Sequence, residues 1–178
     1  MDHKKPDIQV IIGLGNPGPT YYHNRHSIGF RVVDALVDKC GGSWRDRQDM
    51  SVAEILINDK KVLIIKPQTF MNASGRIIPF LAHRGINAEN MLVVHDELEQ
   101  PFGKVSFRIG GSARGHNGLK SIIASCGDQF ARIRCGIGRP EQKEQVPTYV
   151  LQNFSENSTE VDCLIESAVK MIEQCLID

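Results

Sequence analysis

His26 and Asp96 carry side chains that could share acid–base chemistry. An imidazole takes up and returns a proton near neutral pH, and a carboxylate can hold its second ring nitrogen and stabilise the imidazolium as it forms. Asn16, Asn72 and Asn117 add neutral amide groups, which suit an uncharged carbonyl and the oxyanion that develops from it. No serine stands in the G-x-S-x-G motif that presents a nucleophile. The set therefore favours direct attack on a carbonyl by an activated water.

Other interpretations of the same side chains stay open at this point. His23 and His26, at positions i and i+3, could bind a metal ion together with His95 or Asp96. Asp96 after a strand could instead cap the next turn, and asparagines beside glycines could be turn residues that tolerate the left-handed conformation. The choice depends on the elements that position these residues.

Four polar segments carry the candidates, and three of them follow predicted strands. Ligands of open α/β sheets bind outside the carboxyl ends of the strands, so these segments converge if their strands are parallel neighbours. The segments are the loop with Asn16, Tyr21, His23 and His26, KPQTFMNASG (66–75) with Phe70, Met71 and Asn72, HDELEQPFG (95–103) with His95 and Asp96, and GGSARGHNGLKS (110–121) with His116 and Asn117.

The stretch GLGNPG at 13–18 matches the dinucleotide-binding motif G-x-G-x-x-G, but its context does not. Pro17 and Pro19 bias the residues before them away from the helical region and remove two backbone donors that a pyrophosphate would need. The acidic residues about 20 positions further on, Asp34 and Asp38, fall inside a predicted helix rather than at a strand end. The stretch therefore predicts a rigid loop after a strand.

Apolar periodicity predicts one three-layer α/β domain over residues 1–178, with a mixed twisted sheet flanked by helices. Asn58-Asp59-Lys60-Lys61 between two apolar runs indicates a hairpin, and Ser74 is the expected cap of the second helix, which Gly85 ends. The expected strands are 8–12, 52–57, 62–66, 91–95, 104–109 and 133–137, and the expected helices are 27–40, 74–84, 119–125 and 159–176.

The composition is that of a soluble globular protein, with 41% hydrophobic and 24% charged residues. No apolar run is long enough to cross a bilayer, and the first residues, MDHKKPDIQV, lack a signal-peptide core. The five cysteines form no C-x-x-C pair and their number is odd, which favours reduced thiols and a cytoplasmic location.

The formal net charge is 0, but the charges are unevenly distributed along the chain. Residues 100–145 hold eight basic and three acidic side chains, whereas residues 146–178 hold one basic and six acidic ones. A basic middle segment beside an acidic tail could attract a polyanion to one side of the molecule, or it could be an ordinary solvated surface.

Four ordered blocks make the chain similar to the bacterial peptidyl-tRNA hydrolases. They are GLGNPGPTYYHNRHSIGF (13–30), KPQTFMNASG (66–75), HDELEQPFG with GGSARGHNGLKSI (95–122) and RIRCGIGRP (132–140). The resemblance implies a single α/β domain that needs no metal or cofactor and frees tRNA from peptides by hydrolysing the ester to the terminal ribose.

The resemblance also implies roles for individual residues. His26 would be the general base that activates water, Asp96 would stabilise its imidazole, and Asn16 would help to distinguish N-blocked from free aminoacyl groups. The basic 100–145 segment would hold tRNA through phosphate contacts without reading its sequence, and we expect a monomer that contacts no membrane. The side chains expected to line the site and contact the tRNA or peptide end are Tyr21, Phe70, Asn72 and Asn117.

Some positions depart from the family pattern. Ser27 and Asn24 replace the more usual Asn and Thr around the Arg-His pair, Gln100 replaces a usual Leu, and the chain stops where longer members continue with a basic tail. The main alternative hypothesis is a protein that binds RNA with this fold but has lost hydrolysis. Retention of the histidine, aspartate and asparagine set favours the enzyme.

Overall fold

The computed structural model describes residues 5–177, and its centre is a seven-stranded sheet in the order β2-β3-β4-β1-β5-β7-β6. The neighbours β4, β1, β5 and β7 are parallel, whereas β2, β3 and β6 pair antiparallel, which confirms a mixed sheet. The strands are β1 Val10–Gly13, β2 Arg45–Arg47, β3 Met50–Ile57, β4 Lys60–Pro67, β5 Met91–Glu97, β6 Val105–Ile109 and β7 Ala131–Gly136.

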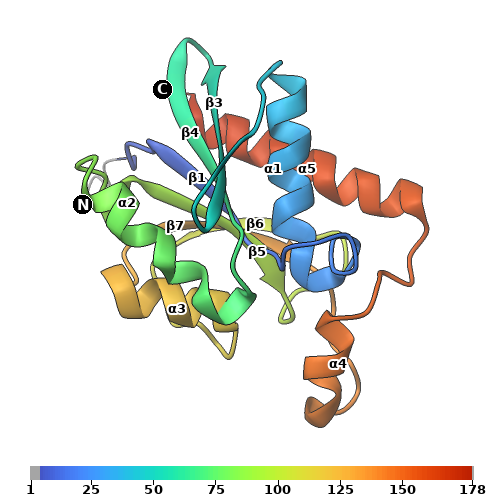
Figure 1. The fold of residues 1–178 in the computed structure, drawn as a ribbon. Coiled ribbons are helices and arrows are strands. Elements are labelled where there is room, and N and C mark those ends of the chain that lie inside the picture. The colour runs from blue at the N-terminus through green and yellow to red at the C-terminus, as the bar shows by residue number, and fades with distance from the viewer. Residues whose placement is uncertain (1–4, 178) are drawn as a thin grey trace.

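Helices cover both faces of the sheet, so the three-layer α/β expectation is confirmed (Figure 1). One face packs against α1 Ile28–Lys39 and α5 Ser158–Leu176, and the other against α2 Ile78–Ala82 and α3 Asn117–Cys126. The remaining helix, α4, is short, as are four 3₁₀ turns: η1 Arg25–Ser27, η2 Met71–Ile77, η3 Ala88–Asn90, η4 Lys143–Gln145 and α4 Val146–Val150.

The elements with the clearest sequence signals form as expected. Asn58 and Asp59 both adopt positive φ between β3 and β4, as the tight hairpin turn requires. The long helix α5 begins at a capping box between Asn157 and Glu160, and its apolar stripe is buried against the sheet.

Two expectations about local structure were wrong, and two short elements were not expected at all. The helix expected at 74–84 is instead η2 followed by α2, because Ala73 is non-helical and Ser74 donates its hydroxyl hydrogen to the Met71 carbonyl rather than capping a helix. Strand β5 extends past the expected end at 95 to Glu97, so Asp96 belongs to the strand and not to a loop. The short elements β2 and α4 carry too few apolar positions to give a periodic signal.

Within residues 5–177, no helix combines the length and apolar character that a bilayer crossing requires.

Candidate active site

The candidate residues converge at the point where the strand order reverses. Strand β1 lies between β4 and β5, parallel to both, so the three carboxyl ends meet at one edge of the sheet. Asn16 follows β1, the segment from Phe70 to Asn72 follows β4, and Asp96 lies near the end of β5. The expected convergence of these segments is confirmed, and such a switch point is where open α/β sheets bind ligands.

Two glycines bring His26 to this edge. A side chain at Gly13 would collide with the backbone of Gly29, and a side chain at Gly29 would collide with the backbone of Leu14 and Val94. The first turn of α1 therefore lies directly against β1 and β5, and His26 sits in η1 just before that turn. The loop at 13–18 opens no helix, as expected, and its first glycine serves this close approach rather than a pyrophosphate.

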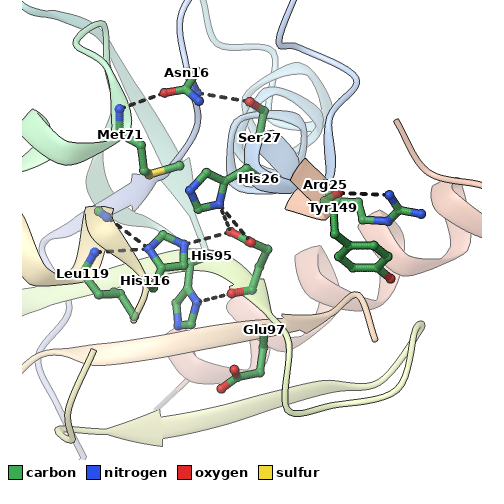
Figure 2. A network of polar contacts seen from close by, with 12 residues as sticks. Asn16, Arg25, His26, Ser27, Met71, His95, Glu97, His116, Leu119 and Tyr149 are labelled. Carbon is green, nitrogen blue, oxygen red and sulfur yellow. Dashed lines mark hydrogen bonds and ion pairs between the residues drawn. The ribbon is translucent and has the colours of Figure 1, made fainter. Parts of the chain in front are cut away.

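His26, labelled in Figure 2, forms a buried pair with Asp96. The Nδ1 atom of His26 lies 3.1 and 3.0 Å from the two carboxylate oxygens of Asp96, and the two residues are 8% and 4% exposed. Burial disfavours the imidazolium, but the charge and hydrogen bond of Asp96 outweigh it and raise the pKa of His26. The pair has the geometry of a base held by a carboxylate.

His116 is a second imidazole on the same carboxylate. Its Nε2 atom lies 2.8 Å from Asp96 Oδ1, while its Nδ1 atom accepts hydrogen bonds from the backbone N–H groups of Gly118 and Leu119 at the start of α3. Because Nδ1 is an acceptor, the proton of the neutral ring must be on Nε2, which donates to Asp96. The N-terminus of α3 thus fixes the tautomer of His116.

Asp96 therefore receives N–H groups from two rings. Burial alone would raise the pKa of this carboxyl, but attraction to His26 and His116 and their hydrogen bonds hold it well below its usual value. A carboxylate oxygen can accept from both rings at once, and the group stays ionised as a fixed acceptor for the Nδ1–H of His26.

Among the described residues, His26, Asp96 and His116 also lie close enough together to hold a metal ion. Their hydrogen bonds fit a metal poorly, because coordination through Nε2 of a neutral His116 would put a proton on Nδ1, facing two backbone N–H donors. The structure also gives no support to a metal site that includes His23, since His23 is exposed and packs against the ring of Tyr22.

His95 lies beside the pair in a structural position. Its Nδ1 donates to the backbone carbonyl of Asp96 at 2.7 Å, and its ring packs edge-on against His116. Full burial, and then repulsion from His116, lower the pKa of His95 to about 3. This ring is neutral and supports the backbone that carries Asp96.

Asn16 is held so that its amide nitrogen remains available. Its Oδ1 accepts from the Met71 backbone N–H at 2.8 Å, and its own backbone N–H donates to Ser27 Oγ at 3.1 Å (Figure 2). With the oxygen occupied, the NH₂ group is the part of the side chain free to meet a ligand. Ser27, a departure from the family pattern, is fully buried and supplies this contact with its hydroxyl.

The other expected site residues surround this centre at different distances. Asn117 lines the same cavity as His26 and Asp96, whereas Asn72 lines a shallow groove between η2 and α3. Tyr21 and Phe70 meet edge to face with centroids 6.1 Å apart, and Phe70 is 60% exposed. Neither ring lines the cavity of His26, so they flank the site next to Asn16 and Met71.

The cavity beside His26 has a volume of about 320 Å³ and is strongly basic on one side. Arg134 and Arg139 are paired with Glu97 and Glu99 at 3.3 and 2.9 Å, and Arg132 is buried and donates to the backbone carbonyls of Gly111 and Ser112. Six of the eight basic residues of the 100–145 segment line this cavity: Arg108, Arg114, Arg132, Arg134, Arg139 and Lys143.

The sequence did not single out His116, Arg132 or Ser27 as supports of the site. A histidine directly before a helix is a weak sign of a cap, and the expected helix began two residues later than α3 does. The buried Gln100, another departure, donates to Ser106 Oγ at 2.6 Å beside Arg134.

The fold and the site together define an α/β protein with a carboxylate-held imidazole at the switch point of its sheet, open to a basic cavity. The model of the family described as peptidyl-tRNA hydrolase matches residues 10–178, and the chain belongs to this family.

Relatives and solved structures agree with this membership. The peptidyl-tRNA hydrolase of Bartonella henselae is 45% identical over 92% of this chain and 86% of its own, and that of Azorhizobium caulinodans is 48% identical over 85% and 75%. The crystal structure of peptidyl-tRNA hydrolase from Acinetobacter baumannii superposes with a TM-score of 0.90 at 34% identity and covers 97% of this chain and 90% of that one. A purine nucleoside phosphorylase from Toxoplasma gondii, with a TM-score of 0.60 at 10% identity, shares the fold alone.

Proposed function

We propose that this chain hydrolyses the ester between the C-terminus of a peptide, or an N-blocked amino acid, and the terminal ribose of tRNA. His26 acts as the general base. The observation that carries the proposal is the state of this ring: Asp96 engages Nδ1, and within residues 5–177 no group is hydrogen-bonded to Nε2. The lone pair of Nε2 is therefore available to a water.

The proposed reaction has two proton transfers. Nε2 takes a proton as the water oxygen attacks the ester carbonyl carbon, and the carbonyl becomes a tetrahedral oxyanion. When the oxyanion collapses, the bond from carbon to the ribose oxygen breaks, and the imidazolium returns its proton to that oxygen. General-base catalysis of this kind supplies a factor of about 10²–10⁴, and the better leaving group of an ester relative to an amide makes one base plausible.

Asp96 and His116 have supporting roles in this proposal. Asp96 keeps the proton of the resting His26 ring on Nδ1 and stabilises the imidazolium, while His116 holds the carboxylate in place from the other side. Neither residue needs to exchange a proton with the substrate.

The asparagines recognise the substrate's neutral groups. The free NH₂ of Asn16 donates to a carbonyl of the acyl group, which helps to select N-blocked over free aminoacyl substrates. Asn117 lines the cavity, and its amide can donate to the developing oxyanion. Asn72 lines a separate groove between η2 and α3 and would contact the tRNA or peptide end there. Tyr21 and Phe70 offer ring surfaces for the acyl group or the terminal base.

The basic side of the cavity holds the RNA backbone in this proposal. Arg108, Arg114 and Lys143 are candidates for phosphate contacts because no carboxylate within residues 5–177 is ion-paired to them, while Arg134 has a partner in Glu97. The proposed site residues lie on or beside one sheet, which supports a single domain over residues 1–178, and we propose that it acts as a monomer. A substrate made at the ribosome supports a cytoplasmic location.

The test is release of N-acetyl amino acid from acetyl-aminoacyl-tRNA, with free aminoacyl-tRNA as the control substrate. We expect the parent protein to cleave only the blocked substrate, and His26→Ala to lose most turnover while it binds tRNA as the parent does. Binding without cleavage by the parent would instead assign the chain to proteins that use this fold to bind RNA.

A further inference from the structure

The outer wall of the active-site cavity is the short helix α4. Its residues Val146, Pro147 and Val150 line the cavity together with the segment that carries His116 and Asn117. Figure 1 shows α4 projecting from the body of the molecule, away from the sheet and the long helices. A five-residue helix in this position needs an anchor, because it has little apolar surface of its own to bury.

Arg25, the residue before His26, makes that anchor. Its guanidinium lies over the ring of Tyr149 in α4, 3.9 Å from the ring centroid, and its NH1 donates to the Tyr149 backbone carbonyl at 3.1 Å (Figure 2). NH2 also lies 3.4 Å from Ser155 Oγ, and the ring of Phe154 is 5.9 Å from the guanidinium carbon. Arg25 is only 4% exposed, so these contacts are shielded from water.

Backbone and side-chain bonds extend the same link. The Arg25 backbone N–H donates to the carbonyl of Gln152 at 3.0 Å, and Asn24 Nδ2 donates to Asn153 Oδ1 at 2.9 Å. Tyr149 in turn donates its hydroxyl hydrogen to the carbonyl of Ile137 at 2.6 Å, which closes the segment from 137 to 149 on itself. The turn that carries His26 and the outer wall are thus joined directly.

The chemistry of this anchor is specific to arginine. Within residues 5–177, no carboxylate is ion-paired to Arg25, so an aromatic face and neutral oxygens compensate its buried charge. A flat guanidinium can stack on a ring and donate in its plane at the same time, whereas an ammonium cannot do both. A charge with no carboxylate partner, buried against one aromatic ring, indicates a contact built to hold that ring.

We propose that Arg25 is a positioning residue that holds α4 against the catalytic turn and so sets the width of the substrate cavity. The proposal rests on the proposed function, because it assigns α4 to the wall that the acyl or terminal nucleotide end of the substrate meets. The stack with Tyr149 is the contact through which Arg25 acts. Its loss weakens substrate binding and leaves the chemistry of His26 unchanged.

The first measurement is hydrogen–deuterium exchange, which requires no activity. Arg25→Lys and Tyr149→Leu should each speed exchange of the backbone amides in 146–152 by about tenfold, with the rest of the sheet unaffected. Arg84→Lys is the control, because Arg84 stacks on Phe80 at 3.8 Å, on α2 and away from α4. Exchange in 146–152 that matches the parent in both variants would overturn the proposal.

The second measurement is the kinetics of acetyl-aminoacyl-tRNA hydrolysis by the same proteins. We expect KM to rise about 5- to 20-fold in Arg25→Lys and in Tyr149→Leu while kcat changes less than about threefold, and the double variant to be no worse than either single one. A fall in kcat at constant KM would overturn the proposal, since Arg25 would then act on His26. Independent, multiplying effects of the two substitutions would also overturn it. A parent without hydrolytic activity would refute the proposed function, and the exchange result would still decide whether Arg25 holds α4.

Discussion

Replacing Asp96 with asparagine should move the proton of His26 to the wrong nitrogen. Asp96 now accepts from Nδ1–H of His26 and from Nε2–H of His116. An asparagine has one oxygen, and His116 must keep it, because its own Nδ1 is occupied by the N–H groups of Gly118 and Leu119. The asparagine NH₂ then faces His26, which responds by accepting on Nδ1 and carrying its proton on Nε2.

The expected fall in kcat of Asp96→Asn has two causes. If His26 kept its proton on Nδ1, its buried N–H would point at the asparagine NH₂, and neither donor would have an acceptor. This costs about 1–3 kcal/mol and lowers the population of the active tautomer by about 5- to 150-fold. The imidazolium also loses the carboxylate that stabilises it, which removes a further factor of about ten for each unit of pKa shift lost. We expect kcat to fall by about 10²–10⁴-fold, or ~3–5 kcal/mol on the barrier, with KM nearly unchanged.

A second substitution separates this mechanism from simple loss of charge. In His116→Asn, the new side chain has an oxygen that can cap α3, but it is too short to reach position 96. When this change is combined with Asp96→Asn, the amide oxygen at position 96 is no longer used by residue 116 and can accept from His26. The double variant should therefore be about tenfold more active than Asp96→Asn alone, although His116→Asn by itself lowers activity. Steady-state hydrolysis of acetyl-aminoacyl-tRNA and nitrogen-15 NMR of the His26 ring report rate and tautomer. A double variant as slow as or slower than Asp96→Asn would refute the reasoning.

Three further outcomes follow from the geometry. The hydrolysis rate of the parent protein should fall toward acid pH with a midpoint above 6.5, the ordinary pKa of histidine. The reason is that the pKa of His26 is raised, so this base becomes protonated at a higher pH than a free histidine. A pH–rate profile with its midpoint below 6.5 would contradict the pairing with Asp96. Gly29→Ala should destabilise the fold by about 1–3 kcal/mol in urea unfolding, since the new side chain meets the backbone of Leu14 and Val94, whereas equal stability would show that α1 can move away from β1. Arg108→Gln should weaken tRNA binding and lower its salt slope by about one, while Lys170→Gln, in α5 and outside the cavity lining, leaves both unchanged. Identical slopes in the two variants would exclude the proposed phosphate contact.

The fold was predictable where a local signal was strong and consistent. The hairpin of β3 and β4 has turn residues between two apolar runs, and α5 has a cap and a continuous apolar stripe, so both were expected at nearly their observed positions. The helix at 74–84 failed because its apolar residues are shared between a 3₁₀ turn and a short helix, a division that periodicity cannot detect. Asp96 was assigned to a loop since strand ends are set by pairing, here with β7, and not by composition.

The site was predictable in its residue types and only partly in its arrangement. The sequence indicates His26, Asp96 and the asparagines because their side chains suit water attack on a carbonyl. It gives no sign that His116 shares the carboxylate, because that contact spans 20 residues and depends on where α3 begins. Ser27 and Arg25 look like ordinary neighbours of His26, yet their partners lie 11 and more than 120 positions away.

His116 adds something that Asp96 alone does not provide. The negative charge of Asp96 is enough to stabilise the imidazolium of His26, but the second imidazole also fixes how Asp96 meets that ring. A carboxyl group alone can hold either tautomer of His26, because it accepts from Nδ1–H when ionised and donates to Nδ1 when it has taken up a proton. The Nε2–H of His116, whose ring is fixed in turn by the backbone of α3, stabilises the ionised form of Asp96, and an ionised carboxylate can only accept from His26. The orientation of the base is therefore set by a helix terminus, a feature that does not titrate, and this is why the asparagine variant is expected to fail through its tautomer and to recover when His116 is removed.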